Sequence, residues 1–219
     1  MLPYEKSVYS QNGEDGIIEF LLDYVSLDQK NFLEIGWGRG SVNCCKNLAM
    51  NHNFTGTGID RKRQKINVEN VNVIVKEITV EHIDYIISLE GNEPTVFSLD
   101  IDSYDWHLLK ALLLKNFKPK IICHEYNSLL GPTLSITRSL NKDTVYDKYI
   151  LYGASLQAYK KILSSEYNFI TVDSAGVNAF WLRKDFNKPT NYSFYDFKSI
   201  DATVDYNNII SNDPQWVIV

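Results

Sequence analysis

The chain has 219 residues, of which 44% are hydrophobic and 22% are charged, and its formal net charge is −5. This composition is typical of a folded globular chain and argues against disorder. The negative net charge argues against sequence-independent binding of nucleic acid, which needs a broad basic surface. We expect no membrane span, because no apolar run approaches the roughly 20 residues that cross a bilayer. The start of the chain lacks the features of a secretory signal, and the three cysteines are expected to be free thiols, so we expect a cytoplasmic protein.

Short apolar runs alternate with amphipathic ones along the chain, which predicts alternating strands and helices. In chain order, the pattern predicts a helix over 10–24, a strand over 31–36, a helix over 41–50 with Ser41 as its N-cap, strands over 55–60 and 71–75, a helix over 80–89, a strand over 95–102, a helix over 106–114, a strand over 119–125, a helix over 155–164, and strands over 169–172 and 177–183.

This alternation predicts an α/β fold. We expect a Rossmann-like, doubly wound, mostly parallel seven-stranded sheet with an antiparallel edge hairpin and with helices on both faces. No linker composition divides the chain, so residues 1–219 are predicted to form one domain with a core over about 8–185. The tail at 185–219 either wraps this domain or adds edge structure.

A glycine-rich turn follows the first predicted strand. Gly36, Gly38 and Gly40 alternate in a G-x-G-x-G pattern directly before a predicted helix, where helix N-terminal amides face a bound molecule. The spacing differs from the G-x-G-x-x-G dinucleotide fingerprint. Asp60 ends the second strand, where a carboxylate can bind both ribose hydroxyls, and Glu77 is a candidate for an adenine amino group. The alternatives are a turn or capping acid at Asp60 and a solvated loop acid at Glu77.

Three features together resemble a class I S-adenosylmethionine (SAM)-dependent methyltransferase. They are Glu34, which is an acid two positions before the first glycine, the glycine turn itself, and Asp60. The resemblance covers roughly residues 8–185 and implies seven strands with the last one antiparallel, and SAM as the cofactor. The residues assigned to the cofactor site in and after the sheet are Glu34, Gly36, Gly38, Asp60, Arg61, Glu77 and Asp100.

The string YSQNGEDG at 9–16 looks like the N-terminal signature of FkbM-like methyltransferases, which act on sugars and natural products. Two glycines around an acidic pair suggest a backbone that touches a ligand, so Gln11, Gly13, Glu14 and Asp15 are also assigned to the cofactor site. Three later strings agree with this branch, namely SLDIDSYD at 98–105, HEYN at 124–127, and GASL at 153–156 followed by NAF at 178–180. Ser103 replaces a more usual glycine, which leaves the acids intact.

Acidic side chains follow two neighbouring predicted strands, where ligands of doubly wound sheets bind. The first possible chemistry is general base catalysis, in which Asp102 or His124 takes the proton of an acceptor hydroxyl and Glu125 lies beside it. His124 and Glu125 alternate along a strand, so their side chains point to opposite faces. The alternative is structural, with Asp100 and Asp105 capping the next helix and Glu125 bound to a backbone amide.

The second possible chemistry uses a divalent metal ion. Asp102, Glu125 and Asn127 offer oxygen ligands that suit Mg²⁺ or Mn²⁺, and such an ion would bind and acidify neighbouring sugar hydroxyls. Residues 128–153 are rich in tyrosine and are predicted to form the acceptor-binding loop, with an ordered crossover containing a short helix as the alternative.

The sequence therefore predicts a SAM-dependent O-methyltransferase that acts on a hydroxyl of a sugar or glycan. The alternatives are a methyltransferase for another small polar or natural-product acceptor, and a nucleotide-fold binding module without catalysis. The oligomeric state is left open.

Overall fold

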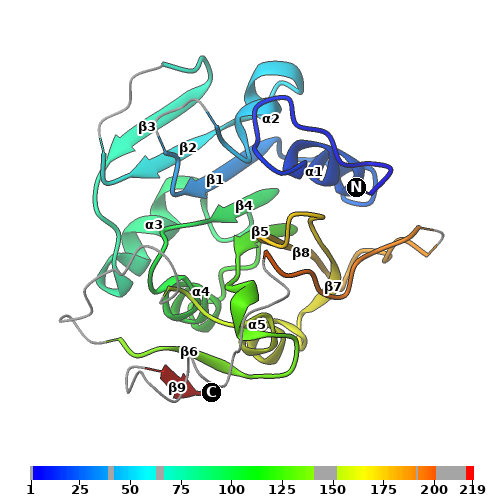
Figure 1. Cartoon of the computed structure of the whole chain (residues 1–219). Coiled ribbons are helices and arrows are strands. Elements are labelled where there is room, and N and C mark those ends of the chain that lie inside the picture. Colours follow the sequence, from blue (N-terminus) through cyan, green and yellow to red (C-terminus); the bar gives the residue numbers. More distant parts are fainter. Residues whose placement is uncertain (1, 39–41, 63–66, 141–151, 191, 201–215) are drawn as a thin grey trace.

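A computed structural model of the chain describes residues 2–38, 42–62, 67–140, 152–190, 192–200 and 216–219 (Figure 1). The α-helices are α1 (Glu14–Leu22), α2 (Lys46–Asn51), α3 (Ile83–Glu90), α4 (Asp105–Leu114) and α5 (Leu156–Leu163). Two short 3-10 helices are η1 (Val80–His82) and η2 (Ser128–Leu130). The strands are β1 (Asn31–Ile35), β2 (Thr55–Asp60), β3 (Val71–Val75), β4 (Val96–Leu99), β5 (Ile121–Glu125), β6 (Ile136–Arg138), β7 (Tyr167–Val172), β8 (Asn178–Arg183) and β9 (Trp216–Ile218).

Seven strands form one sheet in the order β3-β2-β1-β4-β5-β8-β7 (Figure 1). The pairs among β1 to β5 are all parallel, whereas β8 is antiparallel to both β5 and β7. The last strand of this sheet along the chain is therefore its antiparallel one. The predicted fold class, a mostly parallel seven-stranded sheet with an antiparallel edge hairpin, is confirmed.

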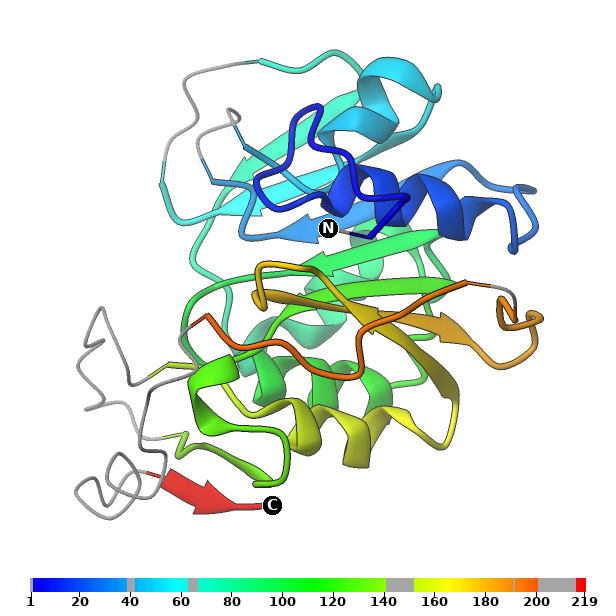
Figure 2. The ribbon, with the colours of Figure 1, turned by 45° about the vertical axis from the view of Figure 1, so that its right-hand side comes forward.

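Helices cover both faces of the sheet, as the sequence predicts (Figure 2). Alternate residues of one strand enter different cores: Phe32 packs with α1 and α2, while Leu33 packs with α3, α4 and α5. All four residues of β4, VFSL, are buried because helices cover both faces of the sheet. A strand buried on both faces has a nearly continuous apolar sequence. No helix among the described residues is long and apolar enough to cross a membrane.

Two predicted helices begin later than the sequence pattern indicates. The first begins at Glu14 instead of residue 10, because Gly13 before it has a φ of +94°, outside the helical region. The second begins at Lys46 instead of residue 41, and its predicted N-cap Ser41 lies outside the described residues. In both cases the residues before the helix form irregular segments beside the carboxyl ends of the strands.

The chain after β5 contains structure that the sequence analysis missed. Strand β6, in the predicted acceptor loop, pairs antiparallel with β9 near the end of the chain. Residues 141–151 of that loop lie outside the described residues. Residues 192–200 of the tail pack along the edge strand β7, since the Val172 amide donates to the Tyr195 carbonyl at 3.1 Å. They then reach the segment after β5, where the Tyr126 hydroxyl donates to the Lys198 carbonyl at 2.6 Å and the Ile200 amide donates to Ser128 Oγ at 3.1 Å.

Candidate functional site

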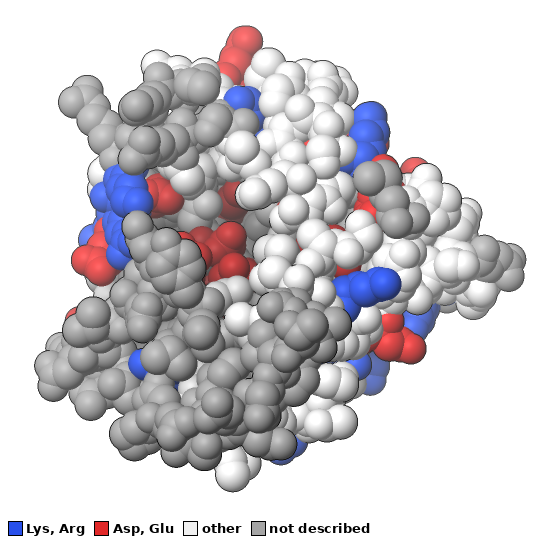
Figure 3. All heavy atoms as spheres, viewed as in Figure 1, with Lys and Arg blue, Asp and Glu red and all other residues white. Residues whose placement is uncertain are grey.

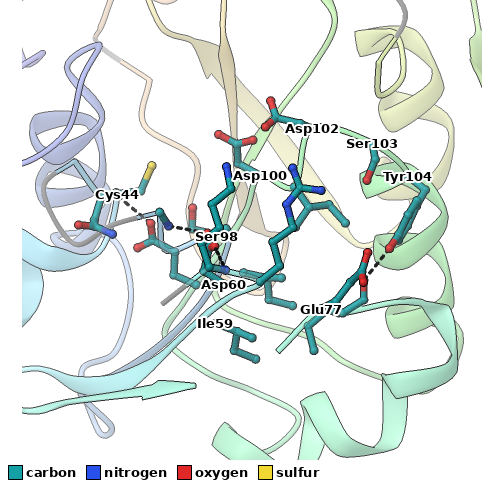
Figure 4. A pocket seen from close by; sticks show the side chains of 18 of the residues that line it. Cys44, Ile59, Asp60, Glu77, Ser98, Asp100, Asp102, Ser103 and Tyr104 are labelled. Atoms are coloured by element: carbon teal, nitrogen blue, oxygen red, sulfur yellow. Dashed lines mark hydrogen bonds between the residues drawn. The ribbon is translucent and has the colours of Figure 1, made fainter. Parts of the chain in front are cut away.

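A cavity of about 810 Å³ lies beyond the carboxyl ends of β1, β2 and β4 (Figure 4). This volume is within the range of about 300–1,000 Å³ that small-molecule sites occupy. On this face of the molecule, acidic side chains gather in a hollow (Figure 3). The segments that line the cavity are 10–12 and 14, 34–36, 38, 42–44, 59–62, 76–81, 98, 100–104, 138–140 and 177–178.

The glycine turn after β1 packs directly against the next strand of the sheet. Gly36 has a φ of +100°, and a Cβ atom there would lie 1.6 Å from the Asp100 carbonyl oxygen, so no larger residue fits. Gly38 has a φ of +62° and donates its N–H to Asp60 Oδ2 at 2.9 Å. Both glycines line the cavity, whereas Gly40 lies outside the described residues.

Asp60 joins the ends of β1 and β2 at the cavity wall. Its Oδ2 accepts from Gly38, and its Oδ1 accepts from the Lys62 amide at 2.6 Å. A carboxylate offers about four acceptor positions, so about two are left for a ligand. The turn role and the binding role predicted for Asp60 are therefore compatible. Arg61 and Glu77 line the same cavity, and Glu77 is labelled in Figure 4.

Glu34, at the carboxyl end of β1, holds the segment before α2. Its two carboxylate oxygens accept from the Cys44 amide at 3.1 Å and the Cys45 amide at 2.7 Å. Burial raises the pKa of Glu34 to about 7. Glu34 lines the cavity, and its hydrogen bonds fix the position of the wall at residues 42–44.

Residues 7–13, which we call the N-terminal hook, are folded onto the first turn of α1 by Asp15. One oxygen of Asp15 accepts from the amides of Val8, Tyr9 and Ser10 at 2.8, 2.7 and 2.8 Å, and Ser10 Oγ accepts from the Asp15 amide at 3.0 Å. Asp15 is thus bound to backbone rather than exposed to the cavity.

The glycines of the N-terminal string also contact protein instead of ligand. A Cβ atom at Gly16 would lie 2.1 Å from the Tyr4 carbonyl oxygen, and one at Gly13 would lie 2.8 Å from Glu5 Cβ. Neither Gly13 nor Asp15 is among the described residues that line the cavity. This corrects the interpretation of these two positions as cofactor contacts.

Gln11 and Glu14 do line the cavity, and Glu14 connects the hook to the sheet. Glu14 Oε2 accepts from the Asn12 amide at 2.6 Å, and Glu14 Oε1 accepts from Asn178 Nδ2 at 2.8 Å. Asn178 is the direct partner of Glu125 in the β5–β8 pair. Through Asn178 the hook is therefore connected to the strand pair that carries Glu125.

Asp100, Asp102 and Glu125 form an acid cluster, in which one oxygen of each lies within 4.8 Å of the others. Figure 4 shows Asp100 and Asp102 side by side at the cavity. Burial, followed by repulsion from Asp105 and Asp102, raises the pKa of Asp100 to about 8. Burial and repulsion from Asp100 also raise the pKa of Glu125 well above its ordinary value. Asp100 and Glu125 are half-buried, and their raised pKa values favour a proton held between them near neutral pH.

His124 lies on the opposite side of β5, in the hydrophobic core. Its Nε2 accepts from Trp181 Nε1 at 2.9 Å, so Nδ1 carries the hydrogen and donates to the Glu125 carbonyl oxygen at 2.9 Å. The ring stacks on Tyr159 with centroids 3.8 Å apart, and burial lowers the pKa of His124 to about 4. Because both nitrogens are used and the ring is buried, His124 cannot serve as the predicted base.

Asn127 and Asp105 bind backbone amides. Asn127 Oδ1 accepts from the Leu129 amide at 3.0 Å and so caps the start of η2. Asp105 accepts from the amides of Ile101 and Ser103 at 2.8 and 3.0 Å, so its carboxylate holds the turn that leads into α4, whose N-cap is Tyr104.

Sequence reasoning missed Asn43, a buried residue that lines the cavity. Its Nδ2 donates to the Trp37 carbonyl oxygen, and its Oδ1 is buried without a hydrogen-bond partner among the described residues. Asn178 was also missed as a site residue, although it lies within one of the strings that carry the family resemblance. No local pattern marks Asn43, because its surroundings come from segments distant in sequence.

No protein-family model and no curated protein sequence matches the chain. Similar solved structures include a fibrillarin/Nop5p complex, at 11% identity over 80% of this chain and 81% of that chain with a TM-score of 0.42. The MccD protein is 9% identical over 78% of this chain and 97% of that chain, with a TM-score of 0.44. The dimethyltransferase RosA from Streptomyces davawensis is 16% identical over 76% of this chain and 53% of that chain, with a TM-score of 0.42. These similarities are too distant to assign an activity or a substrate.

Proposed function

We propose that the protein is a SAM-dependent methyltransferase that transfers a methyl group to a hydroxyl of a sugar or glycan. The observation that carries this proposal is one cavity that brings together the glycine turn, Asp60 and two members of the acid cluster, Asp100 and Asp102. The sugar acceptor is supported by the FkbM-like strings of the sequence, and cofactor and acceptor would occupy adjoining parts of the cavity.

The residues at the glycine turn fit the cofactor. Asp60 keeps about two acceptor positions, which matches the two hydroxyls of a ribose. The unpartnered Oδ1 of Asn43 is a buried acceptor beside the cavity and suits an amino group, because a buried acceptor without a donor is costly. Gln11, Glu14, Glu34 and Glu77 add polar groups to the same wall.

SAM, when bound, supplies an electrophilic methyl group on a positively charged sulfur. The acceptor hydroxyl must lose its proton as the new bond forms, and a carboxylate within hydrogen-bond reach takes that proton. We assign this role to Asp102, which is the exposed member of the acid cluster. Asp100 lines the same cavity and has a raised pKa beside Glu125, so its part is to orient the acceptor by a hydrogen bond.

A divalent ion is the second way in which the acid cluster would act. Asp100, Asp102 and Glu125 offer hard oxygen ligands of the kind that Mg²⁺ and Mn²⁺ prefer. Binding such an ion would displace the proton held between Asp100 and Glu125, so the affinity for the ion would increase with pH. Chelation by EDTA separates the two versions, because activity that survives chelation leaves Asp102 as the base.

Calorimetry with S-adenosylhomocysteine (SAH) tests the cofactor assignment. Asp60→Ala removes two hydrogen bonds to a charged group, each worth about 1.5–3 kcal/mol, so SAH affinity should fall at least about 100-fold. Asp60→Asn keeps an oxygen for the Gly38 amide and separates ligand contact from loss of the turn. Asp84→Ala, an exposed carboxylate on α3 that pairs with Lys115, is the control. Absence of SAH binding to the unmodified protein would overturn the assignment.

A panel of sugars and glycans incubated with protein and SAM tests the acceptor. The expected product is a sugar whose mass has increased by one methyl group. Asp102→Asn should reduce turnover about 10²- to 10⁴-fold, as expected for loss of a general base, while SAH binding is retained. Methylation of other small polar molecules but no sugar would overturn the sugar assignment alone.

A further inference from the structure

Asn178 is a buried cavity residue that the proposed reaction leaves without a role. It is the first residue of β8 and is 4% exposed. Because it lines the cavity, the little surface that it keeps faces the cavity. Its amide donates to Asp173 Oδ2 at 2.7 Å, and its carbonyl oxygen accepts from the Asp173 amide at 3.0 Å. Its side chain therefore projects from a part of the wall whose backbone is held on both sides.

Glu14 decides which end of the Asn178 amide faces the cavity. Asn178 Nδ2 donates to Glu14 Oε1 at 2.8 Å. Glu14 also accepts from the Asn12 amide at 2.6 Å and from Asn12 Nδ2 at 3.2 Å, so three N–H groups point at this carboxylate. A carboxylate only accepts hydrogen bonds, so it binds the amide nitrogen of Asn178 and not its oxygen. Asn178 Oδ1 accepts no hydrogen bond from the described residues, which leaves this atom for a ligand.

The place of β8 in the sheet puts Asn178 at the end of the cavity away from the ribose ligand. Strand β2, which ends in Asp60, and β8 are separated by β1, β4 and β5. Neighbouring strands lie about 4.8 Å apart, so β2 and β8 are roughly 19 Å apart across the sheet. Asp60 is the proposed ribose ligand, and Asn178 therefore belongs to the part of the cavity that is left for the acceptor.

Asn178 is also a direct neighbour of the acid cluster. It is the partner of Glu125 in the antiparallel β5–β8 pair. Side chains of such partners lie on the same face of the sheet, with Cβ atoms about 4.5–5.5 Å apart. One oxygen of Glu125 lies within 4.8 Å of one oxygen of Asp102, the proposed base. A sugar whose reacting hydroxyl is bound to Asp102 therefore has a neighbouring substituent close to Asn178.

We propose that Asn178 binds the methyl acceptor by accepting a hydrogen bond from a second hydroxyl of the sugar, and that Glu14 is the positioning residue that turns Asn178 Oδ1 toward this hydroxyl. The assignment rests on the proposed function and narrows its substrate class. The acceptor is a sugar with a free hydroxyl beside the one that is methylated, because a sugar without that hydroxyl leaves Asn178 Oδ1 without a donor.

Single-deoxy derivatives of the sugar that the panel identifies test the role of Asn178. With the unmodified protein, loss of one hydroxyl besides the methylated one should lower kcat/KM about 10- to 100-fold, as expected when a buried acceptor loses its donor. Asn178→Ala should lower kcat/KM for the parent sugar by a similar factor and should no longer distinguish it from that derivative. A merely structural role would lower kcat/KM for both sugars equally, so an unchanged ratio between them would overturn the proposal.

Glu14→Gln tests the positioning role and leaves Asn178 in place, so it decides the question even where Asn178→Ala does not fold. Glutamine donates as well as accepts, so the Asn178 amide can turn its nitrogen to the cavity, and the preference for the parent sugar should decrease. Glu19→Gln, on the same helix but outside the described cavity lining, is the matched control and should keep the preference. An undiminished preference in Glu14→Gln would overturn the role of Glu14.

Calorimetry separates this proposal from the proposed function. SAH affinity should be unchanged in Asn178→Ala, because Asn178 is assigned to the acceptor and not to the cofactor. If no sugar is methylated by the unmodified protein, the proposed function and the role of Asn178 fail together. If a sugar is methylated and Asn178→Ala weakens SAH binding while it keeps the preference among sugars, only the role of Asn178 is overturned.

Discussion

The acid cluster should make the protein less stable as the pH rises, and Asp100→Asn should remove part of this dependence. Burial and the neighbouring acids raise the pKa of Asp100 to about 8 in the folded protein. In the unfolded chain, an aspartate titrates at about 3.9. Between these two values the folded protein keeps a proton that the unfolded chain releases, so the free energy of unfolding decreases with pH.

One extra proton in the folded state corresponds to a slope of about 1.4 kcal/mol per pH unit. The contribution of Asp100 is fully present below about pH 4, is lost progressively up to about pH 8, and is constant above that value. Between about pH 5 and 8 the loss amounts to about 4 kcal/mol, a large share of a typical stability of about 5–15 kcal/mol. Asparagine binds no proton, so the variant lacks this loss. Its free energy of unfolding relative to that of the unmodified protein should therefore increase with pH, by this slope.

Urea unfolding at several pH values between about 5 and 8 measures this slope. Tryptophan fluorescence can report the transition, because Trp37 and Trp181 are fully buried and become exposed on unfolding. Asp84→Asn, at the exposed ion pair with Lys115, controls for a general change in charge. The free energy of unfolding of Asp100→Asn can also differ from that of the unmodified protein by an amount that does not depend on pH, because the substitution changes the hydrogen bond with Glu125. Parallel pH dependences for Asp100→Asn and the unmodified protein would refute the reasoning.

Three further expectations follow from the packing and from ligand binding. Gly36→Ala places a Cβ atom 1.6 Å from the Asp100 carbonyl and should cost more than about 3 kcal/mol in urea unfolding, whereas Gly91→Ala, with positive φ but open space, should cost about 1 kcal/mol. Trp181→Phe leaves His124 Nε2 without its donor and should cost about 1–3 kcal/mol, with SAH affinity unchanged in calorimetry. SAH at about 100 times Kd should increase the free energy of unfolding by about 2.7 kcal/mol, and the absence of a thermal shift would contradict the site.

The main sheet was predictable from the sequence because its strands are short apolar runs separated by amphipathic helices. The β6–β9 pair was not, since each strand has three residues and the partners lie about 80 positions apart in the chain. The later starts of α1 and α2 were also missed. A positive φ at Gly13 and the carboxylate of Glu34 determine the preceding segments, and neither effect appears in helical periodicity.

The site was predictable where a residue's place follows from the strand before it. Asp60 and Asp102 follow β2 and β4, and parallel strands end at the same edge of a sheet, so their approach to one cavity follows from topology. Alternation along β5 predicted that His124 and Glu125 face opposite sides, but not which side is the core. Tyr159, from α5, decides that point by stacking on His124.

The N-terminal string shows why a motif alone does not separate ligand contacts from structural residues. Asp15 binds three backbone amides of the hook, and this arrangement carries Gln11 to the cavity wall. A substitution of Asp15 would therefore displace Gln11 and weaken ligand binding even though Asp15 lines no part of the described cavity. Substitution of Gln11, which is exposed, should affect binding without a comparable loss of stability. The two roles within YSQNGEDG are thus distinguished by measuring stability and affinity on the same variants.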